Sequence, residues 1–269
     1  SIAEVVAVAR TDERVELTSA ALARMAASRD VVEQLTDGAP VYGITTGFGA
    51  LATVSIPPER RRALQVALVR SHAAGMGDPV EREVVRAMIF LRARTLALGF
   101  SGARPVVAVG MVDLLNADIT PVVPEFGSLG ASGDLAPLAH GALALLGEGE
   151  VDHDGTRRPA ADALHDAGIA PIELVEKEGL AVTNGTDAIL GMLCLAVDDT
   201  RRLLTQADLI AAMTVEGLLA TDAPFAAELQ ALRPQPGQAV SAANLRAVLA
   251  GSPIVASHAT DDDHRVQDA

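Results

Sequence analysis

The chain has 269 residues, of which 49% are hydrophobic, and its formal net charge is −14. Its size allows one large core or two smaller ones, and its acidity argues against nucleic acid and anionic membranes as partners. The chain has no run of about 18 uncharged apolar residues and no basic, apolar leader, so we expect neither a membrane span nor a signal peptide.

A single cysteine, Cys194, excludes an internal disulfide and is typical of the reducing cytoplasm. It lies in the apolar stretch LGMLCLAV, where we expect a buried small hydrophobe. Aromatic residues make up only 2% of the chain, which favours closely packed helices with a core of Ala, Leu and Val.

Hydrophobic residues recur at helical spacing along most of the chain. We predict Thr18 and Asp134 as N-caps, and Pro57 and Pro58 as the start of a helix. The predicted helices are 17–35, 58–75, 79–99, 104–116, 135–149, 160–167, 185–221 (as one helix or two) and 241–251.

The segments between these helices are rich in Gly, Thr and Pro. Residues 40–54 and 120–133 are expected to be irregular, and 150–159 (EVDHDGTRRP) to form a hairpin that turns at Asp154-Gly155. The predicted fold is mainly α. A mixed N-terminal domain at 1–185 carries an Ala-Ser-Gly loop, and 186–269 begins a long-helix bundle.

Residues 127–140 read GSLGASGDLAPLAH, with Ser132 at the centre of the glycine-rich part. A nucleophile elbow would need Gly-x-Ser-x-Gly after a strand, but Asp134 stands in the last place and no strand pattern leads in. A Walker loop would need Gly-Lys-Ser/Thr, which is absent. A glycine-rich turn that leads into a helix is the plainest structural interpretation.

Ala131-Ser132-Gly133 has a third chemistry available to it. The amide nitrogen of the glycine can attack the carbonyl carbon of the alanine, and loss of two waters then gives 4-methylideneimidazol-5-one, a strong electrophile. Gly leaves the attacking nitrogen unhindered, Ala is small enough for ring closure, and Ser supplies the hydroxyl that leaves. A helix beginning at Asp134 would direct its N-terminal dipole toward this ring and stabilise negative charge on it.

The stretch 127–140 resembles the signature of the aromatic amino-acid ammonia-lyase family, which includes histidine, phenylalanine and tyrosine ammonia-lyases and related aminomutases. Three further motifs resemble the same family: YGITTGFG at 42–49, QVALVRSHAAGMG at 65–77, and EGLAVTNGT at 178–186, with Val182 in place of the usual Leu. Together they imply an enzyme that uses the self-formed ring, with no external cofactor and no metal.

By position, the resemblance implies that Ala131, Ser132 and Gly133 form the electrophile and that Tyr42 is the base for the β-proton, or its acid–base partner. Asn184 would bind the ring or the substrate carboxylate region, although a helix N-cap is its plainer interpretation. His72 would contact the substrate side chain.

The Ser71-His72 pair resembles the histidine-specific members, which implies elimination of ammonia from L-histidine to give trans-urocanate. One tyrosine aminomutase branch also carries Ser-His, so a tyrosine or phenylalanine lyase or an aminomutase stays an alternative. The resemblance also implies a cytoplasmic homotetramer with composite active sites. Because members are about twice this length, the chain is expected to match the N-terminal half, and an inactive fragment is a further alternative.

The remaining histidines show no spacing typical of metal ligands, so we expect no metal. We expect His140 to be a helix residue packed near the site and His153 to be exposed in the hairpin. The acidic run Asp261-Asp262-Asp263 is expected to be a solvated loop.

Overall fold

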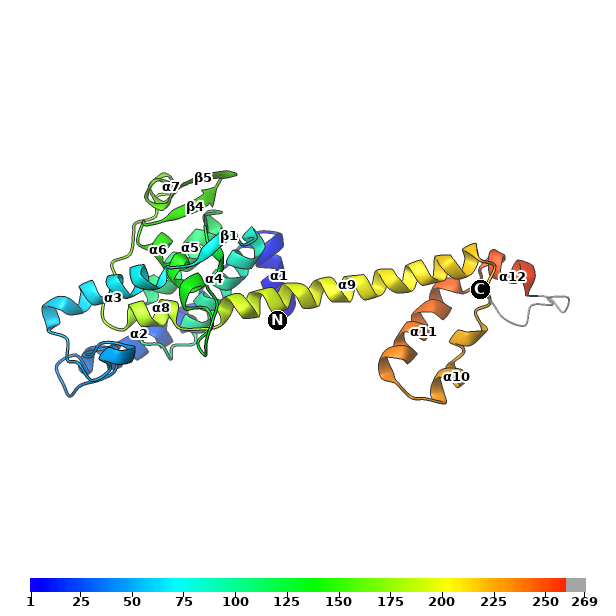
Figure 1. Ribbon diagram of the computed structural model, residues 1–269, viewed down its shortest axis with the longest axis horizontal. Helices are drawn as coiled ribbons and strands as arrows, with labels where there is room; N and C mark the ends of the chain where they lie inside the picture. Colours follow the sequence, from blue (N-terminus) through cyan, green and yellow to red (C-terminus); the bar gives the residue numbers. More distant parts are fainter. Residues whose placement is uncertain (260–269) are drawn as a thin grey trace. The chain divides into compact units, whose positions relative to one another are not determined.

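The computed structural model describes residues 1–259, which form mainly helices, as the sequence predicts (Figure 1). The predicted acidic loop at 261–263 lies outside the described residues. The chain divides into two compact units, Ser1–Ala196 and a second unit that begins at Val197.

The first unit consists of short helices with small strand pairs between them. Its helices are α1 (Ile2–Arg10), α2 (Ser19–Gln34), α3 (Pro58–His72), α4 (Arg82–Ala97), α5 (Pro105–Asn116), α6 (Leu135–Leu145), α7 (Ala160–Asp166), α8 (Glu178–Thr183), the first part of α9 (Asp187–Gly217) and the short 3-10 turn η1 (Gly49–Leu51).

Helix α4 lies in the main core of this unit. It packs against α1, α2, α5 and α6, and its buried face includes Met88 and Leu96. Two arginines of α4, Arg86 and Arg92, are also buried, and both donate hydrogen bonds to backbone carbonyls. Helix α4 therefore contributes to the core and also supplies two arginines that hydrogen-bond to neighbouring segments.

The strands form two small antiparallel sheets. β1 (Met76–Pro79) pairs with β3 (Pro124–Phe126), and β2 (Thr120–Pro121), β4 (Glu150–His153) and β5 (Thr156–Pro159) form a sheet with β4 in the centre. The predicted hairpin is confirmed. Its turn residues Asp154 and Gly155 have φ of 52° and 70°, as a primed turn requires.

Two predictions about this part of the chain are wrong. The helix predicted at 79–99 is present as α4 but begins at Arg82 and not at Pro79, because 76–79 pairs with β3 and the residue before a proline favours extended backbone. His153 is not exposed, because it lies on the central strand with 12% of its side chain accessible. The expected irregular stretch 120–133 also contains β2 and β3.

The sequence pattern did not predict α1. Its signal is a capping box, in which the Ser1 hydroxyl accepts from the Glu4 N–H and the Glu4 carboxylate reaches back to the N-cap backbone. The predicted cap at Thr18 is confirmed, because its hydroxyl accepts from the Ala21 N–H at 3.2 Å. Cys194 is buried and free, as expected.

The second unit contains the rest of α9, η2 (Ala223–Phe225), α10 (Ala227–Ala231), α11 (Pro236–Leu249) and α12 (Pro253–His258). A small core holds it together, composed of Ala212, Leu245, Leu249 and Val255. Within residues 1–259, no helix is long and apolar enough to cross a bilayer.

Candidate active site

The residues Ala131-Ser132-Gly133 lie in a tight turn. The Gly133 N–H donates to the Gly130 carbonyl at 3.3 Å, and both glycines have positive φ, 76° at Gly130 and 55° at Gly133. Just outside this turn, the Leu129 N–H donates to the Gly133 carbonyl at 2.9 Å. Ala131 is exposed and Ser132 half-buried. The backbone therefore bends back on itself at the three residues with the ring-forming pattern.

Asp134 anchors this turn from behind. It is fully buried, and its carboxylate accepts from the Ser128 hydroxyl at 2.8 Å and from the Ile189 N–H at 3.0 Å. Asp134 occupies the N-cap position of α6, as predicted, but its side chain makes no capping bond to that helix. Instead it ties the turn to the start of α9.

The turn contacts the segment that follows α8. Gly133 and Gly185 form a parallel β-bridge, and the Asp134 N–H donates to the Gly185 carbonyl at 3.1 Å. The φ of 55° at Gly133 favours glycine, and a Cβ atom there would lie 2.8 Å from Ile189 Cδ1, so the end of that side chain would have to move. Tertiary structure thus places the predicted Asn184 segment beside the predicted ring-forming residues.

Asn184 follows the last residue of α8, and its side chain is exposed. It is not the N-cap of the long helix, because α9 begins three residues later at Asp187. Its carbonyl accepts from Arg92 Nη1 at 3.2 Å, and the same nitrogen donates to Ala181 at 3.3 Å. Arg92 also forms a buried ion pair with Asp187.

Arg92 is a part of the site that the sequence motifs did not identify. Its signal in the sequence is an arginine on the apolar face of a helix, which needs a buried partner. The partner, Asp187, lies 95 residues away along the chain.

Tyr42 lies in a compact segment between α2 and α3. Its side chain is 48% exposed, its hydroxyl accepts from the Gly49 N–H at 3.2 Å, and its ring meets Phe48 edge-on at 6.1 Å between centroids. A Cβ on Gly43, where φ is 72°, would lie 3.2 Å from a methyl group of Leu180 in α8. The Tyr42 segment therefore packs against the helix that leads to Asn184, although the Tyr42 contacts themselves lie within its own segment.

His72 is the last residue of α3 and is half-buried. Its Nδ1 lies 2.9 Å from the Leu68 carbonyl and 3.0 Å from the Ser71 hydroxyl. A carbonyl oxygen can only accept, so Nδ1 carries a hydrogen and Nε2 is the acceptor nitrogen of the neutral ring.

The turn after His72 runs beside the glycine-rich stretch. A Cβ on Gly127 would lie 3.4 Å from the Cα of Gly75, and the Gly75 N–H donates to His140 Nε2 at 3.2 Å. His140 is on α6, as predicted, and burial lowers its pKa below the usual value of 6.5. It thus holds the end of α3 close to the ring-forming turn as a neutral acceptor.

The four predicted segments are linked through neighbouring elements and are not all in direct contact. Direct contacts join the 131–133 turn to 184–186, while the Tyr42 and His72 segments pack on α8 and α6 respectively. Within residues 1–259, no three His, Cys, Asp or Glu side chains are grouped as a metal site.

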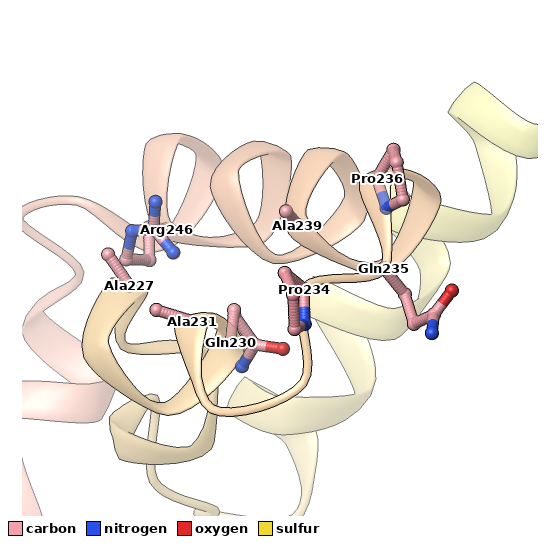
Figure 2. Close-up of a pocket in the computed structure, with 8 residues that line it drawn as sticks. All are labelled: Ala227, Gln230, Ala231, Pro234, Gln235, Pro236, Ala239 and Arg246. Atoms are coloured by element: carbon pink, nitrogen blue, oxygen red, sulfur yellow. The ribbon is translucent and has the colours of Figure 1, made fainter.

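A separate groove in the second unit lies between α10 and α11 (Figure 2). Only one of its eight lining residues is charged: Arg246, whose guanidinium donates to the Phe225 carbonyl. The other lining residues are Ala, Pro and Gln, so this groove offers no acid–base pair for catalysis.

Comparison with known proteins agrees with the motifs. The profile of the family described as aromatic amino acid lyase matches residues 1–269. A histidine ammonia-lyase of Streptomyces coelicolor is 59% identical over 268 residues, which are 99% of this chain and 52% of that protein. The chain thus spans about half the length of the curated relatives it matches.

Solved structures with the same fold include a tyrosine aminomutase from Streptomyces globisporus, with a TM-score of 0.88, 37% identity, and coverage of 94% of this chain and 48% of that one. A histidine ammonia-lyase from Trypanosoma cruzi has a TM-score of 0.84 and 35% identity, and covers 92% of this chain and 48% of that one. With its ordered motifs, its helical fold and a profile match along its whole length, the chain belongs to the aromatic amino acid lyase family.

Proposed function

We propose that the protein containing this chain is a histidine ammonia-lyase that converts L-histidine to trans-urocanate and ammonia. The observation that carries this proposal is the tight turn at Ala131-Ser132-Gly133, anchored by Asp134 and bridged to Gly185. The 59% identity to a histidine ammonia-lyase supports the choice of substrate.

The turn fits formation of a 4-methylideneimidazol-5-one ring. Positive φ at Gly133 bends the chain back, and this glycine offers an unhindered nitrogen toward the preceding residues. The bonds at Asp134 hold the bend against the starts of α6 and α9, which supports approach of the Gly133 nitrogen to the Ala131 carbonyl carbon. When formed, the ring would supply an electrophilic methylene to the substrate amine or its imidazole.

The remaining steps of the proposed reaction are assigned to Tyr42, His72 and Asn184. Tyr42 removes the β-proton of the substrate. His72 offers Nε2 as an acceptor for the imidazole N–H, because its Nδ1–H is already used by Leu68. Asn184, exposed beside Gly185, hydrogen-bonds the ring or the substrate carboxylate region. The N-terminus of α6 stabilises negative charge that develops at the turn.

The assembly and organisation follow the same proposal. We propose a cytoplasmic homotetramer with composite active sites, and no nucleic-acid or membrane partner. The N-terminal catalytic domain comprises 1–185 and carries the ring-forming turn, and 186–269 is the first part of the central helical bundle.

A tyrosine aminomutase is the second candidate, because a protein of that name has the same fold at 37% identity. A phenylalanine or tyrosine lyase has weaker support, and an inactive member of the family is the remaining alternative.

Two measurements on the natural full-length protein test the proposal. Intact mass should be lower than the sequence mass by two water molecules, and Ser132→Ala should restore the unmodified mass while leaving the circular dichroism spectrum unchanged. Formation of a conjugated acid should then be followed with L-histidine, L-tyrosine and L-phenylalanine. Conversion of L-tyrosine to its isomer β-tyrosine, without turnover of L-histidine, would replace the first candidate with the second, and an unmodified wild-type mass would contradict both.

A further inference from the structure

We propose that Arg61 is a positioning residue that fixes the Tyr42 segment by holding both of its ends. Its link to catalysis rests on the proposed function, because it assumes that Tyr42 takes the β-proton. The structural part of the inference, that one side chain anchors residues 37–55 to α3, does not depend on that function.

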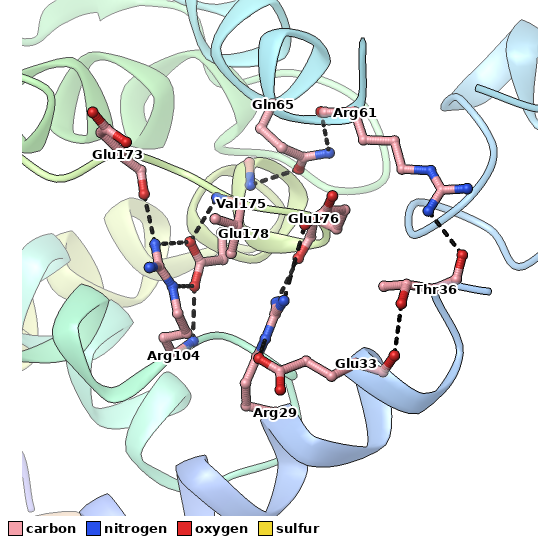
Figure 3. A network of polar contacts seen from close by, with 11 residues as sticks. Arg29, Glu33, Thr36, Arg61, Gln65, Arg104, Glu173, Val175, Glu176 and Glu178 are labelled. Atoms are coloured by element: carbon pink, nitrogen blue, oxygen red, sulfur yellow. Dashed lines mark hydrogen bonds and ion pairs between the residues drawn. The ribbon is translucent and has the colours of Figure 1, made fainter. Parts of the chain in front are cut away.

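Arg61 is in the first turns of α3 and is only 8% exposed. Its Nη1 donates to the Thr36 carbonyl at 2.8 Å, and its Nε donates to the Ile56 carbonyl at 3.1 Å. These two carbonyls immediately flank the segment that contains Tyr42, and Figure 3 shows the guanidinium directed at Thr36. One rigid, planar group thus holds the two ends of the segment close together.

The segment is internally bonded, so holding its ends also orients its middle. The Ile56 N–H donates to the Thr45 carbonyl at 2.8 Å, and the Gly47 N–H donates to Val54 at 3.1 Å. The Val41 N–H donates to the buried Thr45 hydroxyl at 2.8 Å. Tyr42 lies between Val41 and this bonded part. Its position therefore depends on where Arg61 holds the two ends of the segment.

The same face of α3 also holds α8. Gln65 follows Arg61 by four residues, is 1% exposed, and its Oε1 accepts from the Gly179 N–H at 2.9 Å (Figure 3). Its Nε2 donates to the Arg61 carbonyl at 3.4 Å. Residues 61, 65 and 72 recur on one helical face, so a single helix sets the spacing of the Tyr42 segment, α8 and His72.

Lysine cannot replace Arg61 in this role. A guanidinium offers N–H donors on separate nitrogens in a fixed plane, so it reaches two carbonyls that lie in different directions. The donors of an ammonium all lie on one nitrogen. Both acceptors are neutral carbonyls, so the positive charge alone does not explain the contacts.

Amide hydrogen exchange on the natural full-length protein tests the anchoring. In Arg61→Met, exchange of peptides from 37–56 should be at least about tenfold faster, with peptides from α4 unchanged. Arg60→Met, which removes an exposed arginine from the same helix, should match wild type throughout. Wild-type exchange over 37–56 in Arg61→Met would overturn the proposal.

If Arg61→Met unfolds the core, so that α4 also exchanges faster, Arg61→Lys decides the question. Faster exchange in Arg61→Lys confined to 37–56 supports anchoring by the guanidinium fork, and wild-type exchange overturns it.

Catalysis gives an independent readout. With L-histidine deuterated at the β-carbon, Arg61→Lys should show a lower kcat, a similar KM and a larger kinetic isotope effect than wild type, because proton removal becomes slower. A lower kcat with an unchanged isotope effect would overturn the positioning role. If wild type turns over no amino acid, the proposed function fails, yet hydrogen exchange still decides whether Arg61 anchors the segment.

Discussion

The guanidinium of Arg92, on α4, donates to the carbonyl of Asn184 at 3.2 Å and pairs with the carboxylate of Asp187. All of these contacts are made by one buried side chain. The segment that bridges to the ring-forming turn is thus held from the centre of the core. Its conformation depends on a residue outside every family motif.

Arg92→Met should strongly destabilise the protein. The substitution leaves the buried Asp187 carboxylate without its counter-charge and two carbonyls without a donor, a loss of about 3–5 kcal/mol. The free energy of unfolding in urea measures it. Arg14→Met removes an exposed arginine that lies 3.9 Å from Glu16, and should cost less than about 1 kcal/mol. Equal losses in the two variants would contradict this prediction.

Gly185→Ala should disturb the same site sterically. A Cβ there would lie 1.5 Å from Arg92 Nη2 and 2.5 Å from an Asp187 oxygen, so the ion pair must move. We expect a loss of at least about 2 kcal/mol and a larger fraction of protein without the two-water mass loss. Gly237→Ala, with nothing within 4 Å of the new Cβ, should leave the free energy of unfolding and the mass unchanged. A normal, fully modified Gly185→Ala protein would refute this account.

Asp134→Ala should loosen the ring-forming turn. It removes the buried acceptor for the Ser128 hydroxyl and the Ile189 N–H, and each lost hydrogen bond should cost about 0.5–1.5 kcal/mol. Intact mass should show incomplete dehydration, and urea unfolding should show the lost stability. Asp134→Asn keeps an acceptor oxygen, so its losses should be smaller. The prediction is wrong if Asn and Ala behave alike at wild-type level.

His140 should make stability fall at acidic pH. Burial lowers its pKa below 6.5, so the unfolded chain takes up the proton first as pH falls. The stabilisation is complete above about pH 6.5 and is lost between that value and the lower folded pKa. Between about pH 8 and pH 5, Tm should drop further in wild type than in His140→Gln, whose amide oxygen can still accept from Gly75. Parallel curves would show that His140 contributes nothing to the pH dependence.

Local sequence was sufficient for several elements. Asp154-Gly155 specifies the hairpin turn, since its backbone angles are ones that Asp and Gly tolerate, and Thr18 caps α2 through a bond to a residue three positions away. Helical spacing identified most helices, and the ordered motifs identified the family. Each of these signals lies within a short window, so no distant contact is needed to interpret it.

Tertiary structure decided the rest, because the energies involved come from partners far along the chain. Residues 76–79 are a strand because 124–126 pair with them. Asp134 bonds to Ser128 and Ile189 rather than capping α6, because α9 brings an unpaired N–H to its buried carboxylate. Arg61 and Arg92 hold the Tyr42 and Asn184 segments through backbone carbonyls, which carry no residue-specific signal in the sequence. The sequence by itself determined which residues can form the electrophile, and only the fold determined what holds them in place.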